Sequence, residues 1–442
     1  MNDTHDPDLR SWVPGAGATD SDFPIQNLPF GVYRRRGASE APRVGVAIGE
    51  MILDVAGCAA AGLLEGDGRV AAEACAAPSL NALMALGAAP ASTLRAQLSA
   101  ILRTGPRASH FEAATRDLLT PQAEAELLLP AVVGDYTDFY ASIHHATRVG
   151  RILRPDHPLL PNYRWLPIGY HGRASSLVPS GHPVIRPRGQ CAPAGDGPPT
   201  VRPTRRLDYE GEVGALVGTE NDLGRSVPLA EAERHLFGIC LVNDWSARDI
   251  QAWEYQPLGP FLGKSFATTL SPWVVTMEAL EPFRTPLTPH GPDDSPLLGY
   301  LDDAADRARG GIDVTVEAWL SSKRMREMAM PPVRLAVGRT RDLYWTFGQM
   351  LAHHTSNGCN LRTGDLIASG TISGPEEESG GCLLELTRGG TRPIRLPSGE
   401  ERTFLEDGDE VILRGYCERD GWVRIGLGEC RGVVLPAENA SA

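Results

Sequence analysis

The sequence predicts a mostly β fold of the α+β class, on the basis of two observations. The chain of 442 residues contains 48 glycines and 36 prolines, which favours a turn-rich β architecture over a helical bundle. Its candidate strands are short, and irregular loops rather than regular helices separate them, which disfavours a doubly wound sheet. These strands span residues 44–48, 51–53, 211–216, 237–242, 311–319, 366–369, 383–387 and 410–416.

The chain divides into three parts. Residues 1–20 are polar and contain prolines, and we expect them to form a flexible tail. Residues 21–130 are expected to form an N-terminal domain, in which two short strands around the turn at Gly49 and Glu50 indicate a small barrel. A helical segment follows, because residues 80–86 repeat leucine with helical spacing. Residues 131–437, in which glycine, proline, acids and aromatics interleave in short motifs, are expected to form the catalytic, metal-binding domain.

Composition excludes several kinds of partner. The formal net charge is −13, which argues against a nucleic-acid partner, because phosphate binding needs a basic face. The sequence has no apolar run near the roughly 18 residues that span a membrane, and its N-terminus lacks the apolar centre of a signal peptide. The eight cysteines include no C-x-x-C pair, as expected of reduced thiols. We therefore expect a soluble, cytoplasmic protein.

Acidic residues cluster in three places. Asp138 lies seven residues before His145, so a helix over 138–152 would put both side chains on one face, where the imidazole is a plausible general base. Glu210 and Glu212 lie at i and i+2, so an extended strand would point both to one face, about 6.5–7 Å apart. Such a face is either exposed to solvent or part of a site.

The third cluster lies in residues 243–255. A helix there would align Asp244, Arg248, Gln251 and Tyr255, at offsets 0, 4, 7 and 11, in one polar stripe. Such a stripe is either solvated or lines a site. The glycine- and proline-rich segment that follows holds a single lysine, Lys264.

A site that held Asp138, Glu210, Glu212 and Asp244 together would need a cation. Two like charges about 4 Å apart repel by roughly 4 kcal/mol at an effective dielectric near 20. An all-carboxylate ligand set selects calcium, magnesium or manganese over zinc. The spacing supplies the candidate ligands but does not establish that they converge.

Several long motifs occur in order along nearly the whole chain, from FPIQNLP (23–29) to GVVLP (432–436). The motifs between these ends are DYTDFY (135–140), PIGYHGRASS (167–176), NDWSARDIQAWEY (243–255), PLGPFLGKSF (257–266) and SGTISGPE (369–376). With these motifs in this order, the chain resembles the fumarylacetoacetase family.

The resemblance implies an N-terminal SH3-like barrel, a C-terminal mixed β-sandwich roll and a homodimer. It implies a calcium site formed by Asp138, Glu210, Glu212 and Asp244. A structural magnesium site would map to Asp244 with Lys264 and Thr268. Ala267 stands where the family usually has glycine, which bears on the tight turn at this second site.

The resemblance also implies an enzyme that hydrolyses the carbon–carbon bond of 4-fumarylacetoacetate to fumarate and acetoacetate, the last step of tyrosine and phenylalanine catabolism. His145 would be the general base that activates water, and Glu385 would orient it. Arg248, Gln251 and Lys264 would stabilise the developing negative charge. Substrate would be held by Tyr140, Arg154, Gln251, Tyr255 and Thr371.

Two other functions remain open. The first keeps the metal and changes the substrate, as in an acylpyruvate hydrolase or an oxaloacetate-type decarboxylase of the wider superfamily. The second is a metal-binding structural protein that has lost catalysis. Arg154 and the N-terminal barrel favour the larger diketo acid over the first, and the intact His145, Glu385, Arg248 and Lys264 argue against the second.

Overall fold

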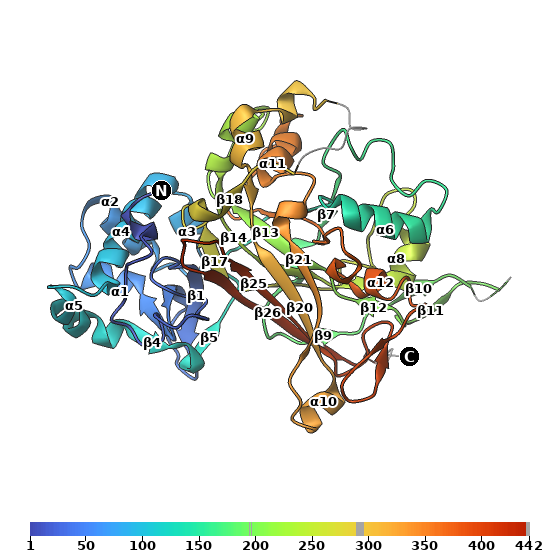
Figure 1. Ribbon diagram of the computed structural model, residues 1–442, viewed down its shortest axis with the longest axis horizontal. Coiled ribbons are helices and arrows are strands. Elements are labelled where there is room, and N and C mark those ends of the chain that lie inside the picture. Colours follow the sequence, from blue (N-terminus) through green and yellow to red (C-terminus); the bar gives the residue numbers. More distant parts are fainter. Residues whose placement is uncertain (194, 196, 289–295, 439–442) are drawn as a thin grey trace.

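The computed structural model describes residues 1–193, 195, 197–288 and 296–438. The fold is a mixed α and β architecture with two large sheets (Figure 1). The strands of the larger, 13-stranded sheet are β1 (Phe30–Arg35), β2 (Arg43–Ile48), β3 (Met51–Asp54), β4 (Leu119–Pro121), β5 (Ala125–Leu127), β6 (Tyr136–Phe139), β7 (Gly169–Gly172), β8 (Leu177–Pro179), β13 (Gly211–Val217), β14 (Leu236–Asp244), β16 (Thr268–Leu270), β17 (Trp273–Thr276) and β22 (Leu366–Ala368).

A second sheet of five strands and four two-stranded sheets complete the β structure of the described residues. The five-stranded sheet has the order β21 (Val333–Arg339), β20 (Thr315–Ser321), β25 (Glu410–Cys417), β26 (Ile425–Leu435) and β9 (Val184–Ile185). The small sheets pair β10 (Arg188–Cys191) with β11 (Thr200–Pro203), β12 (Leu207–Asp208) with β15 (Ser246–Ala247), β18 (Arg284–Thr285) with β19 (Gly311–Ile312), and β23 (Ile394–Arg395) with β24 (Glu401–Arg402).

Helices are short and lie at the margins of the sheets. Five of them gather around the N-terminal strands at one end of the molecule (Figure 1): α1 (Val55–Ala60), α2 (Gly66–Ala74), α3 (Asn81–Met84), α4 (Ala88–Leu102) and α5 (Ala108–Thr115). The others are α6 (Ile143–Leu153), α7 (Leu229–Ala232), α8 (Arg248–Glu254), α9 (Ala304–Arg309), α10 (Lys323–Glu327), α11 (Phe347–Thr355) and α12 (Leu383–Leu386). Among the described residues, no helix is both long and apolar enough to cross a membrane.

The N-terminal strands join the large sheet instead of standing apart from it. β1 pairs with β17, with Phe30 opposite Val274, and also with β2 and β5. Between described strands the pairings run from β4 to β7 without closing, so the expected small barrel of SH3 type is not confirmed. One apolar core contains residues of the N-terminal helices together with Leu216 and Val242 of the central strands.

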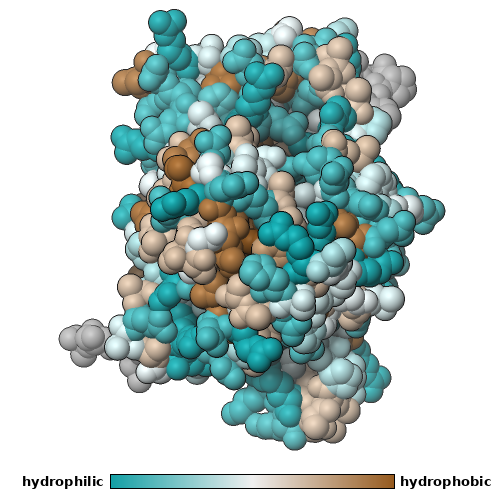
Figure 2. Space-filling model, turned by 90° about the vertical axis from the view of Figure 1, so that its left-hand side faces the viewer, coloured by the Kyte–Doolittle hydropathy of each residue, from teal (hydrophilic) through white to brown (hydrophobic). Residues whose placement is uncertain are grey.

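The N-terminal segment is packed, contrary to the expectation of a tail over residues 1–20. Thr4, His5, Val13 and Ala16 are buried, and Nε of the buried Arg95 in α4 donates a 3.0 Å hydrogen bond to Oγ1 of Thr4. A buried guanidinium needs hydrogen-bond acceptors, and Thr4 supplies one. This contact holds the N-terminal segment against α4. On the face that carries this end of the molecule, hydrophobic side chains gather in a patch surrounded by hydrophilic ones (Figure 2).

Candidate active site

Four acidic side chains meet at the centre of the large sheet. Asp138 lies on β6, Glu212 on β13 and Asp244 at the end of β14, and Glu210 directly precedes β13. The order β14, β13, β22, β6 brings these strands together, with Ala368 of β22 opposite Asp138. All four residues are buried, and one carboxylate oxygen from each lies within 4.8 Å of the others. Sheet order thus achieves a convergence that sequence spacing could not establish.

Two of the helices expected from the sequence begin later than predicted. Asp138 belongs to a strand, and α6 starts only at Ile143, because Oγ of Ser142 caps the helix by accepting a 3.2 Å hydrogen bond from the backbone N–H of His145. Asp244 likewise ends a strand, and α8 starts at Arg248. The helical faces predicted for Asp138 with His145, and for the stripe beginning at Asp244, are therefore wrong, although the structure still places these side chains around one site.

Basic and hydroxyl groups satisfy two of the four acids. Nζ of Lys264 donates to Glu210 and, at 2.7 Å, to Oδ2 of Asp244. Nη1 of Arg248 lies 2.7 Å from Oε1 of Glu210. Burial alone would raise the pKa of Glu210, but the charges of Lys264 and Arg248 outweigh burial and hold that pKa below its ordinary value. Asp244 also accepts hydrogen bonds from Oγ1 of Thr268 at 2.8 Å and from the hydroxyl of Tyr170 at 2.6 Å.

The other two acids lack such partners. Oδ1 of Asp138 and both carboxylate oxygens of Glu212 are buried and have no hydrogen-bond partner in the part of the chain that the structure describes. Burial, together with the neighbouring acids, raises the pKa of Asp138 and of Glu212 well above ordinary values. Carboxylates that are buried and unpaired are costly unless a cation binds them. An all-oxygen donor set of this kind fits a hard divalent metal ion.

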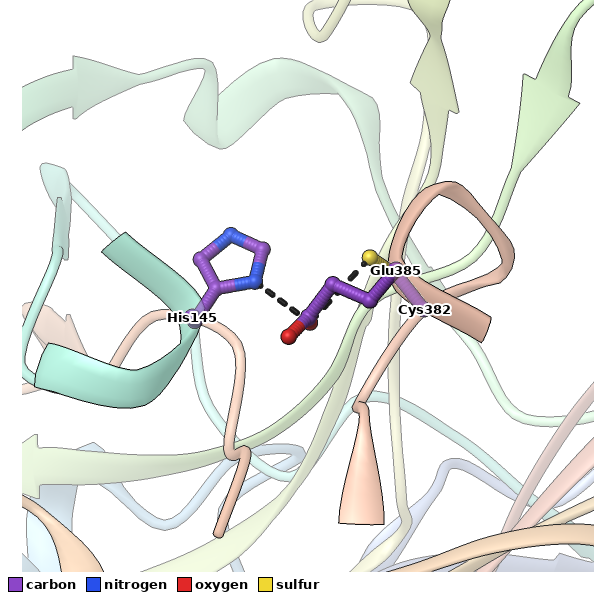
Figure 3. A group of neighbouring side chains, drawn as sticks. All are labelled: His145, Cys382 and Glu385. Atoms are coloured by element: carbon purple, nitrogen blue, oxygen red, sulfur yellow. Dashed lines mark hydrogen bonds and ion pairs between the residues drawn. The ribbon is translucent and has the colours of Figure 1, made fainter. Parts of the chain in front are cut away.

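A histidine–glutamate pair lies at the same site (Figure 3). Nδ1 of His145 lies 2.6 Å from Oε1 of Glu385. The same oxygen accepts hydrogen bonds from Oγ of Ser373 at 2.8 Å and from Sγ of Cys382 at 3.4 Å. Burial would raise the pKa of Glu385, but the interaction with His145 outweighs burial and lowers it. The carboxylate is therefore ionised and fixes the orientation of the imidazole.

Glu385 lies on a helix and not on the strand predicted over residues 383–387. The residues from Leu383 to Leu386 form the single turn α12. Its first backbone N–H groups, those of Leu383 and Leu384, donate to the carboxylate of Asp208 at 2.7 and 2.9 Å. An acid that binds the free N–H groups at the start of a helix stabilises the helical turn. This stabilisation outweighs the strand preference of the apolar residues 383–387.

A cavity of about 590 Å³ lies beside these groups. His145, Arg248, Gln251 and Lys264 line it, whereas Glu212, Asp244, Thr268 and Glu385 are not among its lining residues. The rings of Tyr140 and His145 meet edge to face, with centroids 5.3 Å apart. The predicted substrate-binding residues all line the cavity: Tyr140, Arg154, Gln251, Tyr255 and Thr371.

Sequence reasoning missed three residues that support this site. Asp208 binds Arg248 and the start of α12, Tyr170 binds Asp244, and Ser373 binds Glu385. Asp208 and Tyr170 lie beside or within the motifs already singled out, so proximity in sequence was the available signal. Ser373 likewise lies within the motif at 369–376, but no spacing indicated its contact with Glu385, which depends on the fold.

Comparison with known proteins gives consistent similarities over nearly the whole chain. Residues 26–130 match the family model described as "Fumarylacetoacetase N-terminal", and residues 136–435 match "Fumarylacetoacetate (FAA) hydrolase C-terminal". The chain is 48% identical to a fumarylacetoacetase from Oryza sativa subsp. japonica, covering 97% of this chain and 98% of that protein. It is 47% identical to a fumarylacetoacetase from Homo sapiens, covering 97% and 99%.

The fold is also similar to that of a solved structure. A fumarylacetoacetate hydrolase from the psychrophile Exiguobacterium antarcticum superposes with a TM-score of 0.50 at 18% identity, covering 93% of this chain and all of that one. At this identity the similarity concerns the fold alone.

Proposed function

Since the chain belongs to the fumarylacetoacetase family, it is a hydrolase that cleaves a carbon–carbon bond of fumarylacetoacetate, and we propose that His145 and Glu385 perform this reaction beside a divalent metal ion. The observation that supports this mechanism most directly is the 2.6 Å contact between Nδ1 of His145 and Glu385. His145 lines the same cavity as Asp138 and Glu210 of the acidic cluster.

His145 is the general base. The ionised Glu385 accepts a hydrogen bond from Nδ1–H, which leaves Nε2 as the ring nitrogen that can take a proton. Nε2 removes a proton from water, and the water oxygen attacks the carbonyl carbon of the fumaryl group, which is bonded to the CH2 group between the two ketones. Glu385 stabilises the imidazolium that results, as a buried carboxylate does for a neighbouring cation.

The negative charge that develops on the carbonyl oxygen is stabilised by Arg248, Gln251 and Lys264. Nη2 of Arg248 is a buried donor with no hydrogen-bond partner among the described residues, so it is available to an oxyanion. The carbon–carbon bond then breaks, and its electron pair passes to the enolate of acetoacetate. The proton that His145 took from water converts the enolate to acetoacetate and restores the neutral imidazole. Fumarate is the other product.

Asp138, Glu210, Glu212 and Asp244 would hold the metal ion. We propose calcium for this site, and a second, structural magnesium ion at Asp244 with Lys264 and Thr268. A bound divalent cation supplies Lewis-acid polarisation of the diketone oxygens. Tyr140, Arg154, Gln251, Tyr255 and Thr371 hold the substrate, with the guanidinium of Arg154 suited to a carboxylate.

Family membership also supports a proposal for the wider setting of the enzyme. We propose a homodimer that acts in the cytoplasm at the last step of tyrosine and phenylalanine catabolism, with an N-terminal SH3-like barrel and a C-terminal β-sandwich roll. The chain matches both family models, and it is similar over 95% or more of its length to relatives from rice, human and cattle. These similarities favour the larger diketo acid over an acylpyruvate or oxaloacetate.

A panel of β-diketo acids tests this function. The purified protein is assayed with and without a chelator by the loss of 1,3-diketone absorbance. We expect the fastest loss with fumarylacetoacetate, and we expect the chelator to abolish it. Faster turnover of an acylpyruvate, or turnover of fumarylacetoacetate that the chelator leaves unchanged, would contradict the substrate or the metal dependence respectively.

A further inference from the structure

The cationic side chains of the cavity fall into two groups. Arg154, Arg206, Arg248 and Lys264 all line it. Arg248 and Lys264 are neutralised, because Arg248 pairs with Asp208 and Glu210 and Lys264 pairs with Glu210 and Asp244. Arg154 and Arg206 have no acidic partner among the residues that the structure describes, and Nε of Arg154 is buried without any hydrogen-bond partner. The cavity therefore carries two uncompensated positive charges.

Arg206 is held in place by neutral groups. Its Nη2 donates a 2.6 Å hydrogen bond to the backbone carbonyl of Gly389. Its guanidinium lies 4.8 Å from the ring centroid of the buried Phe404, in a cation–π contact. These contacts orient the guanidinium without neutralising it, and they occupy only one of its five N–H donors. An arginine oriented in this way can bind a carboxylate through two donors at little entropic cost.

We propose that Arg206 binds one of the two carboxylates of the substrate while Arg154 binds the other. This inference rests on the proposed function, since fumarylacetoacetate carries one carboxylate at its fumaryl end and one at its acetoacetate end. The two arginines then act as a pair that selects diketo acids with a carboxylate at each end. Arg206 is a specificity-determining residue, and the proton transfers at His145 do not depend on it.

Two analogues of the substrate make this proposal testable. Crotonylacetoacetate lacks the fumaryl carboxylate, and fumarylacetone lacks the acetoacetate carboxylate. kcat and KM are measured for both analogues and for fumarylacetoacetate with the metal-loaded wild type, Arg206→Gln and Arg206→Lys. Arg205→Gln is the matched control, because Arg205 is an exposed neighbour that does not line the cavity.

We expect Arg206→Gln to lower kcat/KM for fumarylacetoacetate by roughly 10- to 100-fold, mainly through KM, as the loss of a charge-assisted hydrogen bond predicts. For the analogue that lacks the carboxylate bound by Arg206, the same substitution should change kcat/KM less than about threefold. The analogue that is insensitive to the substitution therefore identifies the carboxylate that Arg206 binds. Arg206→Lys should restore part of the loss, and Arg205→Gln should match wild type on all three substrates.

Equal losses on all three substrates, or no loss on any, would overturn the assignment of Arg206. Failure of the proposed function gives a different result, because the wild type itself would then not turn over fumarylacetoacetate. Thermal unfolding of each variant shows whether a uniform loss comes from misfolding, and Arg206→Lys, which keeps the charge and most of the aliphatic chain, then decides the question.

Discussion

The carboxylate of Asp208 accepts a 2.9 Å hydrogen bond from Nε of Arg248, and both side chains are buried. The same carboxylate binds the backbone N–H groups of Leu383 and Leu384 at the start of α12. Asp208 thereby joins the arginine proposed to stabilise the oxyanion to the helix that carries Glu385. Asp208, which does not line the cavity, thus links the two parts of the proposed catalytic machinery.

Asp208→Asn should weaken both parts. Asparagine keeps the shape but leaves the buried Arg248 with one fewer negative partner, which costs about 3 kcal/mol in the free energy of unfolding. We expect kcat to fall roughly 10- to 100-fold with little change in KM, because positioning is lost while binding groups remain. Steady-state kinetics and denaturant unfolding measure the two effects.

Asp407→Asn is the control for this change. Asp407 pairs with Arg186 at 2.6 Å, but 43% of its side chain is exposed, so its loss should cost less than about 1 kcal/mol. A variant of Asp208 that loses stability and keeps the wild-type kcat would limit this residue to a structural role.

Glu385→Gln should reduce the rate without weakening substrate binding. Glutamine is nearly isosteric but lacks the charge that stabilises the imidazolium of His145, so we expect kcat to fall roughly 10²- to 10³-fold at nearly constant KM. His145→Ala should fall at least as far, and the double variant should be no slower than His145→Ala, because the two residues act as a unit.

The exposed Glu378, seven residues earlier in the chain, supplies the control Glu378→Gln. It should retain the wild-type kcat. Losses in Glu385→Gln and His145→Ala that multiply in the double variant would show that the two side chains act independently, contrary to the proposed pair.

Substitution of a proposed metal-binding acid should affect Tm differently with and without metal. Asp138 and Glu212 are buried beside other acids with unpaired oxygens, so without metal each must either stay ionised without a partner or bind a proton. Asp138→Asn or Glu212→Gln removes this cost and should raise Tm in a chelator. With calcium, magnesium or manganese added, wild type should gain stability and these variants should gain less. A Tm that no divalent ion changes in the wild type would argue against a metal site.

Much of this fold was predictable from local pattern. Candidate strands at 44–48, 51–53, 211–216, 237–242, 366–369 and 410–416 coincide with β2, β3, β13, β14, β22 and β25. These runs are rich in β-branched and aliphatic residues and lie between turn residues. Their intrinsic preference for the extended conformation therefore agrees with the strands that they form in the sheet. Glycine at 49 was also informative, since its φ of +55° suits glycine in the turn between β2 and β3.

The errors occurred where a polar residue changes the local preference. The run over 383–387 has the composition of a strand, but the carboxylate of Asp208, 175 positions before Leu383, binds the free N–H groups of a helical turn. Ser142 caps the N-terminus of α6, so the helix begins after it and Asp138 stays in a strand. The meeting of four acids depends on the order of strands in the sheet, which no spacing within a single segment encodes.

Asp306 provides a pH-dependent prediction far from the acidic cluster. Burial raises the pKa of this carboxyl to about 6, even though Oγ1 of Thr346 donates to both of its oxygens, at 2.9 and 3.2 Å. Because the folded pKa lies above the unfolded value, the folded state holds a proton that the unfolded state releases, and the stability gained from it is complete below about pH 4. That contribution is lost as the pH rises through 6.

Asp306→Asn removes this titration and keeps an acceptor for Thr346. The Tm of the variant relative to wild type should therefore rise between pH 4 and pH 7, by about 1 to 3 °C. Asp302→Asn, which removes an exposed carboxylate four positions earlier, controls for the general effect of charge. Thermal unfolding at intervals of half a pH unit gives the difference curve, whose midpoint should fall between the unfolded and folded pKa values. A Tm difference that falls with rising pH would mean that ionised Asp306 stabilises the fold, which reverses the sign derived from its burial.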